Sequence, residues 1–241
     1  MKKGTICLFI IIIITLTGCS NIQERFSQDD FNNIQTEIPV SKRTIGYMGC
    51  SNTRQTVYGY RWAEGNQIWN VNINNIHDYD SGSVAQWAKD AEKGKGFWEI
   101  FDRELLRNPE TKKIWLQLCI PKGEAKVTYE QSYPIIEMIR KKIPNVTIYI
   151  SPLAEYTENV CEITGVEGIE RGISLAQELD SRNDDLVIGP ILGPLSLAEI
   201  NEEDKSKCHP NEEGMLKMGK QLRNFFDNIE NSTINKTIIK S

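Results

Sequence analysis

Residues 45–53 read "IGYMGCSNT", a short apolar run followed by a glycine, a cysteine and a serine. The run predicts a buried strand over residues 44–48, and Gly49 after it lets the backbone turn sharply. A serine just past the C-terminal end of a strand in a parallel sheet lies at the edge where such sheets bind ligands. Ser51 is therefore either a nucleophile, with the amides after the turn able to donate to an oxyanion, or an ordinary turn serine beside a structural cysteine.

The chain from Arg43 onward alternates short apolar runs with longer helical patterns. This alternation is typical of βαβ units around a mostly parallel sheet. Further strands are predicted over residues 114–119, 146–150 and 186–188, with a weaker one near 68–73, and helices are predicted over 84–92, 97–107, 134–142 and 167–179.

The clearest predicted helix is the last one, because its apolar residues recur at spacings of three and four and so share one face. These residues are Met215, Met218, Leu222, Phe225 and Ile229, and we expect their face to pack on the sheet. Asn211 is the predicted N-cap, and the acidic residues Glu212 and Glu213 suit the positive end of the helix dipole.

The start of the chain has the features of a targeting signal. Residues 1–18 contain two lysines followed by an apolar stretch shorter than the roughly 20 residues that a membrane-spanning helix needs. The string "LTGC", residues 16–19, resembles the lipobox of prokaryotic lipoproteins, which implies cleavage before Cys19 and lipidation of its thiol. An ordinary signal peptide with a chance cysteine is the alternative. The protein is thus predicted to be lipid-anchored to the cell membrane, facing its extracytoplasmic side.

The remaining residues form a single predicted domain with polar flanks. Residues 19–42 are polar and indicate a flexible tether, residues 43–230 fit one α/β domain with a sizeable core, and residues 231–241 form a polar tail. The formal net charge of −5 is spread along the chain without a long basic block, so nucleic acid is disfavoured as a partner.

The chain has six cysteines, of which Cys7 leaves with the signal peptide and Cys19 is the lipidation site. The other four are Cys50, Cys119, Cys161 and Cys208. An even number in an exported protein favours disulfides, and four cysteines allow three pairings among which the sequence does not choose. A zinc site is the alternative, but the chain contains no C-x-x-C pair, so no metal is expected.

A serine nucleophile requires a base, and the chain has only two histidines. His209 precedes the last helix, where Pro210 and Asn211 restrict the loop and cap the helix, so its imidazole is held at a defined place. His77 lies in a polar loop without such support, and we interpret it as solvated. His209 is therefore the candidate base.

These segments resemble those of the SGNH/GDSL hydrolases. "IGYMGCSNT" resembles the first block of the family, an apolar strand followed by Gly-Asp-Ser-x-Thr, and "CHPNEEG", residues 208–214, resembles the last block. "YDSGSVAQWA", residues 79–88, resembles the second block, whose glycine supplies an amide to the oxyanion hole. The resemblance implies a three-layer α/β/α sandwich in which Ser51 is the nucleophile, His209 is the base, and the Ser51 and Gly82 amides hold the oxyanion. An unrelated flavodoxin-like domain, in which Ser51 only caps a turn, is the alternative.

The sequence departs from the family pattern at three places. Cys50 stands where the family has an acidic residue before the nucleophile, a position that does not perform the chemistry. The third block, Gly-x-Asn-Asp, is absent, and Gln117 in "WLQLC" is the candidate to replace its asparagine as an oxyanion donor if the strand register points it into the site. The orienting acid should stand three residues before the histidine, where Ser206 occurs; we expect Asp204 to reach the imidazole through a bulged loop, or else a Ser-His dyad oriented by a backbone carbonyl.

The fold implied by the resemblance also brings the cysteines together. Cys50 and Cys208 neighbour the nucleophile and the base, Cys119 ends a strand at the same sheet edge, and Cys161 lies in a nearby loop. We expect Cys208 to bond to a cysteine of another active-site loop, and the pairing stays open. Cys50 as the nucleophile itself is the chemical rival to Ser51.

The aromatic residues after Ser51 are predicted to pack in a long loop over the domain. They are Tyr58, Tyr60, Trp62 and Trp69, and stacking on sugar rings or lining an acyl pocket is their alternative role.

The sequence therefore predicts a membrane-tethered extracytoplasmic esterase that works through an acyl-enzyme and needs no cofactor. Its substrate is an ester of a small molecule, a lipid or a polysaccharide, among which the sequence does not decide. The alternative is a catalytically inactive surface-binding lipoprotein of the same fold.

Overall fold

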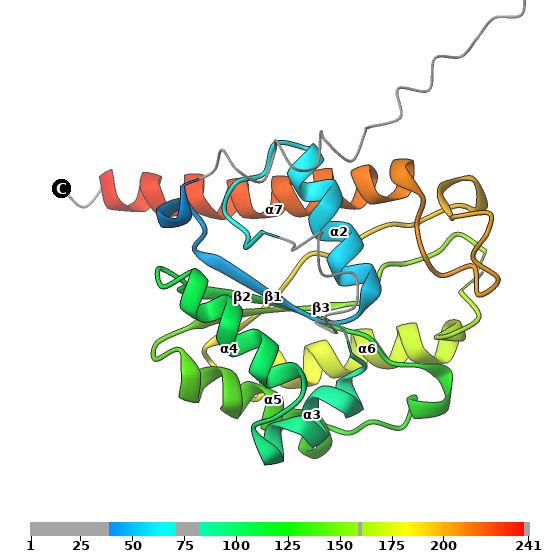
Figure 1. The fold of residues 1–241 in the computed structure, drawn as a ribbon, viewed down its shortest axis with the longest axis horizontal. Coiled ribbons are helices and arrows are strands. Elements are labelled where there is room, and N and C mark those ends of the chain that lie inside the picture. The colour runs from blue at the N-terminus through cyan, green and yellow to red at the C-terminus, as the bar shows by residue number, and fades with distance from the viewer. Residues whose placement is uncertain (1–38, 71–81, 159–160, 239–241) are drawn as a thin grey trace, which may run out of the picture.

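The structure is a computed structural model that describes residues 39–70, 82–158 and 161–238 (Figure 1). The predicted signal peptide, the lipidation site Cys19, most of the tether and His77 lie outside the described residues. Within the described part of the chain, the helices are all too short or too polar to cross a membrane.

The centre of the fold is a four-stranded sheet whose strands run parallel, in the order β1-β2-β3-β4. The strands are β1 (Ile45–Met48), β2 (Lys113–Leu118), β3 (Thr147–Pro152) and β4 (Leu186–Ile188), which confirms the four main strand predictions. Of the weaker predicted strand, Ile68 forms a single parallel bridge with Ile45, and residues 71–73 lie outside the described residues. Because all the strands point the same way, the segments that follow β1 and β2 emerge at one edge of the sheet.

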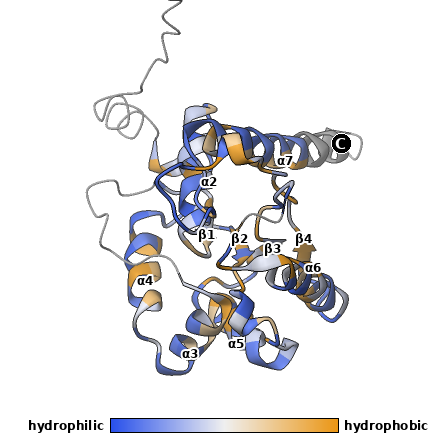
Figure 2. Cartoon of the chain, turned by 90° about the vertical axis from the view of Figure 1, so that its right-hand side faces the viewer, coloured by the Kyte–Doolittle hydropathy of each residue, from blue (hydrophilic) through white to orange (hydrophobic). Residues whose placement is uncertain are grey.

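Helices cover both faces of the sheet, so the fold is a three-layer α/β/α sandwich as predicted (Figures 1 and 2). One face carries α2 (Ser51–Trp62) and α7 (Glu212–Ile238), and the other carries α3 (Val84–Lys93), α4 (Phe97–Arg107), α5 (Tyr129–Lys142) and α6 (Gly165–Ser181). Short 3₁₀ turns occur at Val40–Lys42, Lys122–Glu124 and Leu197–Glu199. The two hydrophobic cores lie on opposite sides of the sheet because successive strand residues alternate between its faces.

The last helix packs with the face that its spacing predicts. Met218 and Leu222 are fully buried in the same core cluster as the sheet residue Trp115, and the Asn211 side chain caps the helix by accepting from the Gly214 amide at 3.0 Å. Phe226 rather than Phe225 fills the innermost position of the next turn. The helix continues to Ile238, past the domain boundary predicted at residue 230.

The helix α2 was not predicted, and it corrects the expectation of a long loop after Ser51. Thr53, Thr56, Val57 and Tyr60 are buried and recur at helical spacing, but two of them are threonines, so the apolar stripe is broken in the sequence. Tyr58, Tyr60 and Trp62 thus belong to this helix, and Tyr60 accepts a hydrogen bond from the Gln67 amide at 3.1 Å.

The helices α2 and α7 touch at two glycines. A Cβ atom on Gly59 would lie 1.7 Å from the Met215 carbonyl oxygen, and one on Gly219 would lie 1.9 Å from the Gly59 carbonyl carbon. Both positions therefore require glycine, because backbone atoms rather than movable side chains fill the space.

Gly59→Ala is expected to destabilise the fold by about 3 kcal/mol, the upper part of the usual range for overpacking a core. Urea unfolding of the variant measures this as a lower midpoint. Gly123→Ala is the matched control, because a Cβ atom on Gly123 meets nothing within 4 Å. Equal midpoints for the two variants would contradict the close contact.

Candidate active site

Ser51 is the first residue of α2, and the turn that presents it depends on Gly49. Gly49 has φ of +154°, and a Cβ atom there would lie 2.1 Å from Thr53 Oγ1. The Cys50 amide donates to Thr53 Oγ1 at 2.9 Å, which ties the turn to the first helical turn. The strand, the glycine turn and the helix start thus fix the position of Ser51 at the C-terminal edge of the sheet.

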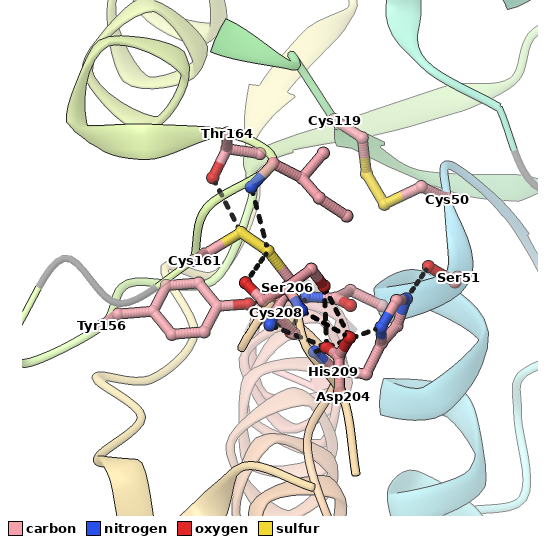
Figure 3. Close-up of a disulfide and its surroundings, with 12 residues drawn as sticks. Cys50, Ser51, Cys119, Tyr156, Cys161, Thr164, Asp204, Ser206, Cys208 and His209 are labelled. Atoms are coloured by element: carbon pink, nitrogen blue, oxygen red, sulfur yellow. Dashed lines mark hydrogen bonds and ion pairs between the residues drawn. A yellow bond between two sulfur atoms is a disulfide. The ribbon is translucent and has the colours of Figure 1, made fainter. Parts of the chain in front are cut away.

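Ser51, His209 and Asp204 form one continuous hydrogen-bonded chain (Figure 3). Ser51 Oγ lies 2.8 Å from His209 Nε2, and His209 Nδ1 lies 2.8 Å from Asp204 Oδ2. Ser51 and His209 are 158 positions apart in sequence, and the loop before α7 brings them together. The structure therefore unites the three residues singled out by the sequence as nucleophile, base and orienting acid.

Asp204 reaches the imidazole from five positions upstream because its loop folds around its carboxylate. The carboxylate accepts from Ser206 Oγ at 2.7 Å, from the Cys208 amide at 2.8 Å and from the His209 amide at 2.7 Å. Partial burial acts to raise the pKa of Asp204, but the hydrogen bonds from Ser206 and from these amides outweigh it and hold the pKa well below its usual range. Asp204 is thus ionised at neutral pH.

The ionised carboxylate fixes the direction of the hydrogen bonds. A carboxylate without a proton only accepts, so His209 Nδ1 must carry the hydrogen that it shares with Asp204. The neutral imidazole then has its lone pair on Nε2, where it accepts from the Ser51 hydroxyl. This is the tautomer in which a histidine can remove a proton from a serine.

Two disulfides lie beside the hydrogen-bonded Ser51, His209 and Asp204. One includes the cysteine directly before Ser51, and the other includes the cysteine directly before His209. Cys50, before Ser51, bonds to Cys119 after β2, and Cys208, before His209, bonds to Cys161 (Figure 3). The partner of Cys208 is therefore a loop cysteine beside the site, as expected. With Cys50 in a disulfide, its sulfur is not available as a nucleophile.

The Cys161–Cys208 bond is expected to contribute about 4 kcal/mol to stability in the chain-entropy account, because it closes a loop with a sequence separation of 47. The double variant Cys161→Ala/Cys208→Ala should have a correspondingly lower urea midpoint than the wild type when both are measured without reductant, so that the wild-type bond stays intact. The double variant Cys50→Ala/Cys119→Ala is the comparison. The bond that it removes closes a loop of similar length, so its free energy of unfolding should fall by a similar amount. An unchanged midpoint in either variant would contradict a stabilising bond.

Asn52 and Tyr156 also join the two halves of the site, a role that was not predicted for either residue. Asn52 Nδ2 donates to Tyr156 Oη at 2.8 Å and to the Cys208 carbonyl oxygen at 3.1 Å, and the Tyr156 hydroxyl donates to that carbonyl at 2.6 Å. Burial raises the pKa of Tyr156, so its hydroxyl keeps its proton for this bond. The residue after Ser51 is thereby tied to the residue before His209.

A cavity of about 190 Å³ opens beside Ser51 and His209. Its walls include both disulfides and the apolar side chains of Pro121, Leu153 and Ile163. Among the described residues that line it, His209 alone has a side chain that can carry a charge. The cavity therefore suits a small, uncharged group.

Two predicted oxyanion donors are placed differently from the expectation. The Gly82 amide donates to the Gly49 carbonyl oxygen at 2.7 Å, because the segment before α3 runs along the turn after β1. Gln117 does not line the cavity: its side chain is buried under α2, where its Oε1 accepts from Thr53 Oγ1 at 2.8 Å. Gln117 and Cys119 face the same side of the sheet, but Gln117 lies two residues earlier and under α2, so Cys119 lines the cavity and Gln117 does not. Both assignments are therefore corrected.

The Ser51 amide is the predicted oxyanion donor that the fold leaves in place. It belongs to the first turn of α2, where amides have no acceptor within their own helix.

The part of the chain that the structure describes contains no cluster of three or more histidine, cysteine, aspartate or glutamate side chains able to hold a metal ion.

Comparison with known proteins gives distant structural likenesses and no sequence match. No family model matches the chain, and no curated protein matches its sequence. Solved structures that resemble it include "Salicylyl-Acyltransferase SsfX3 from a Tetracycline Biosynthetic Pathway", with a TM-score of 0.44 and 18% sequence identity. The alignment covers 77% of this chain and 54% of that chain, so this chain spans about half of that protein's length. The match is too distant to assign an activity.

Proposed function

We propose that this protein is a serine ester hydrolase of the SGNH/GDSL type. The observation that carries the proposal is the chain of two 2.8 Å hydrogen bonds from Ser51 through His209 to Asp204. A serine is a weak nucleophile by itself and becomes effective when a base accepts its proton and a third group orients that base. An inactive binding protein would not need a serine, a histidine and a carboxylate held in this order beside a cavity.

The reaction proceeds in two steps. Ser51 Oγ forms a bond to the ester carbonyl carbon while its proton passes to His209 Nε2, and the carbonyl oxygen becomes an oxyanion near the Ser51 amide. The carbon–oxygen bond of the leaving alcohol then breaks, and the alcohol takes the proton from His209. Water attacks the acyl-enzyme in the same way, with His209 again as the base. Asp204 stabilises the imidazolium that forms in each step.

The cavity supports a small acyl group as the part of the substrate bound beside Ser51. Ligand pockets for whole small molecules are typically about 300–1,000 Å³, and this cavity is about 190 Å³. The alcohol part of the ester would then lie outside the cavity.

The proposed location is the extracytoplasmic face of the membrane, through a lipid on Cys19. The signal-like start of the chain motivates this proposal, and the two disulfides support it because such bonds persist in oxidising compartments. Radiolabelled fatty-acid incorporation in the full chain tests it: label is expected in the wild-type chain and not in Cys19→Ala, and equal labelling would contradict it.

The test of the enzymatic proposal is a rapid-mixing assay with p-nitrophenyl acetate. We expect a burst of p-nitrophenol close to one per protein molecule, or, where deacylation is faster than acylation, saturable steady-state release without a burst. The same protein unfolded in guanidinium chloride is the control. Release no faster than from the unfolded protein would contradict the proposal and favour the inactive binding protein.

A further inference from the structure

The proposed reaction lacks a donor for its oxyanion, because one expected donor is hydrogen-bonded elsewhere and another does not reach the cavity. The Gly82 amide donates a hydrogen bond to the Gly49 carbonyl oxygen, and the Gln117 side chain is buried under α2. Removing one oxyanion donor from an acyl-transfer site costs about 10²–10³ in rate, so a site with the Ser51 amide alone would be a poor catalyst. The other donors that line the cavity therefore decide whether the site can work.

Four polar side chains besides those of Ser51 and His209 line the cavity: Asn52, Ser83, Gln86 and Thr164. The Asn52 amide is committed to Tyr156 and to the Cys208 carbonyl. The Thr164 hydroxyl donates to Cys161 Sγ at 3.1 Å. The remaining two, Ser83 and Gln86, belong to the N-terminal end of α3.

Gln86 is an exposed residue at the rim of the cavity whose side-chain amide is tied to the cap of α3. Its Oε1 accepts from the Ser83 amide at 2.8 Å, and its own backbone amide donates to Ser83 Oγ at 3.3 Å. This reciprocal arrangement is a capping box, which restrains the glutamine side chain. Because Oε1 is occupied, the amide presents Nε2 and its two hydrogens elsewhere, and Nε2 has no acceptor among the described residues.

The same cavity is bordered by the N-terminal ends of two helices. Ser51 and Asn52 begin α2, and Ser83 and Gln86 lie at the start of α3. The N-terminal end of a helix carries a partial positive charge and favours an anion. A negative charge that develops on a substrate oxygen in this cavity would be stabilised by both ends.

We propose that Gln86 is a catalytic residue whose Nε2 donates to the oxyanion in the cavity that it lines together with Ser51. This inference rests on the proposed ester hydrolysis and names the donor that the reaction needs. Gln86 takes the task from Gly82 and Gln117, and its cap with Ser83 positions it before the substrate binds.

Gln86→Glu is the sharpest test, because a carboxylate still accepts from the Ser83 amide and keeps the cap but has no hydrogen to donate. We expect kcat for p-nitrophenyl acetate to fall at least about 100-fold, with the urea midpoint unchanged or slightly raised.

Gln131→Glu is the matched control. Gln131 forms the same capping box on α5, where its Oε1 accepts from the Thr128 amide at 3.0 Å, and it does not line the cavity. This variant should keep the wild-type kcat.

A second variant separates the lost donor from the added charge. Gln86→Met has a similar length and neither donates nor carries a charge, so kcat should again fall about 100-fold. A normal kcat in Gln86→Met would overturn the role of Gln86 as a donor, whatever the effect of glutamate. If the wild-type protein hydrolyses the ester and both variants match it, the role of Gln86 fails while the proposed function stands. If the wild-type protein does not hydrolyse the ester, both proposals fall.

Discussion

In the Ser51→Ala variant, kcat for ester hydrolysis is expected to fall by about 10⁶, the loss typical of removing the nucleophile from a serine hydrolase. The hydroxyl is the atom that forms the acyl bond, and alanine leaves His209 with nothing to activate except water. The Ser51 hydroxyl is hydrogen-bonded to His209 Nε2 and is not the N-cap of α2. Its removal should therefore change the urea midpoint little.

The measurement is steady-state hydrolysis of p-nitrophenyl acetate, with unfolding followed in the same samples. Ser174→Ala is the matched control, because Ser174 lies exposed on α6 and its hydroxyl donates only locally, to the Glu170 carbonyl at 2.9 Å. The control should keep full activity. A Ser51→Ala variant that retains most of the wild-type kcat would mean that another group, or no defined site, performs the hydrolysis.

Asp204→Asn is expected to lower kcat by about 10³–10⁴, because an amide supplies no negative charge to stabilise the imidazolium and can hold the imidazole in the wrong tautomer. Asparagine has nearly the same shape, so the loop should stay folded around it at neutral pH. The measurement is again kcat for p-nitrophenyl acetate. Asp184→Asn, at an exposed position outside the site, is the matched control and should keep full activity. Retention of more than about a tenth of the wild-type kcat would show that Asp204 only shapes the loop.

Asp204→Asn should also change how the stability of the protein depends on pH in acid. The pKa of Asp204 in the folded protein lies below the unfolded value of about 3.9. Its ionised form therefore contributes stability above the unfolded pKa, and this contribution is lost as the pH falls toward the folded pKa. Asp204→Asn should be less stable than the wild type near neutral pH, and the difference should shrink below about pH 4, which acid titration of the urea midpoint measures.

The sheet and most helices were predictable because their local patterns agree with their final burial. The strand β1 and the helix α4 show this, since an apolar run and a helical stripe each carry their own signal. The helix α2 was missed because its buried face contains Thr53 and Thr56, whose burial depends on contacts with Gln117 and α7 rather than on their own polarity.

The residues of the candidate site could be predicted where their place along the chain was enough to find them. They could not be predicted where the direction of an amide or a side chain in the folded protein decides the role. Ser51 and His209 follow from a strand end and a helix cap, and Asp204 follows from its distance to His209. The oxyanion roles predicted for Gly82 and Gln117 were wrong for two reasons. The path of a loop turns the Gly82 amide to Gly49, and Gln117 lies too far back along its strand, under α2, to line the cavity. Likewise, the disulfide pairing and the hydrogen bonds from Asn52 to Tyr156 and Cys208 depend on the completed fold.

The central claim is that the fold activates Ser51 through His209, and covalent labelling tests it most directly. A fluorophosphonate reagent reacts with an activated serine, and mass spectrometry of the reduced tryptic peptide 44–54 locates the adduct. We predict one phosphonyl group on Ser51 in the folded protein, and none in His209→Ala or in the urea-unfolded chain. Folded protein without an adduct on Ser51, or equal labelling of the folded and unfolded chains, would contradict the claim.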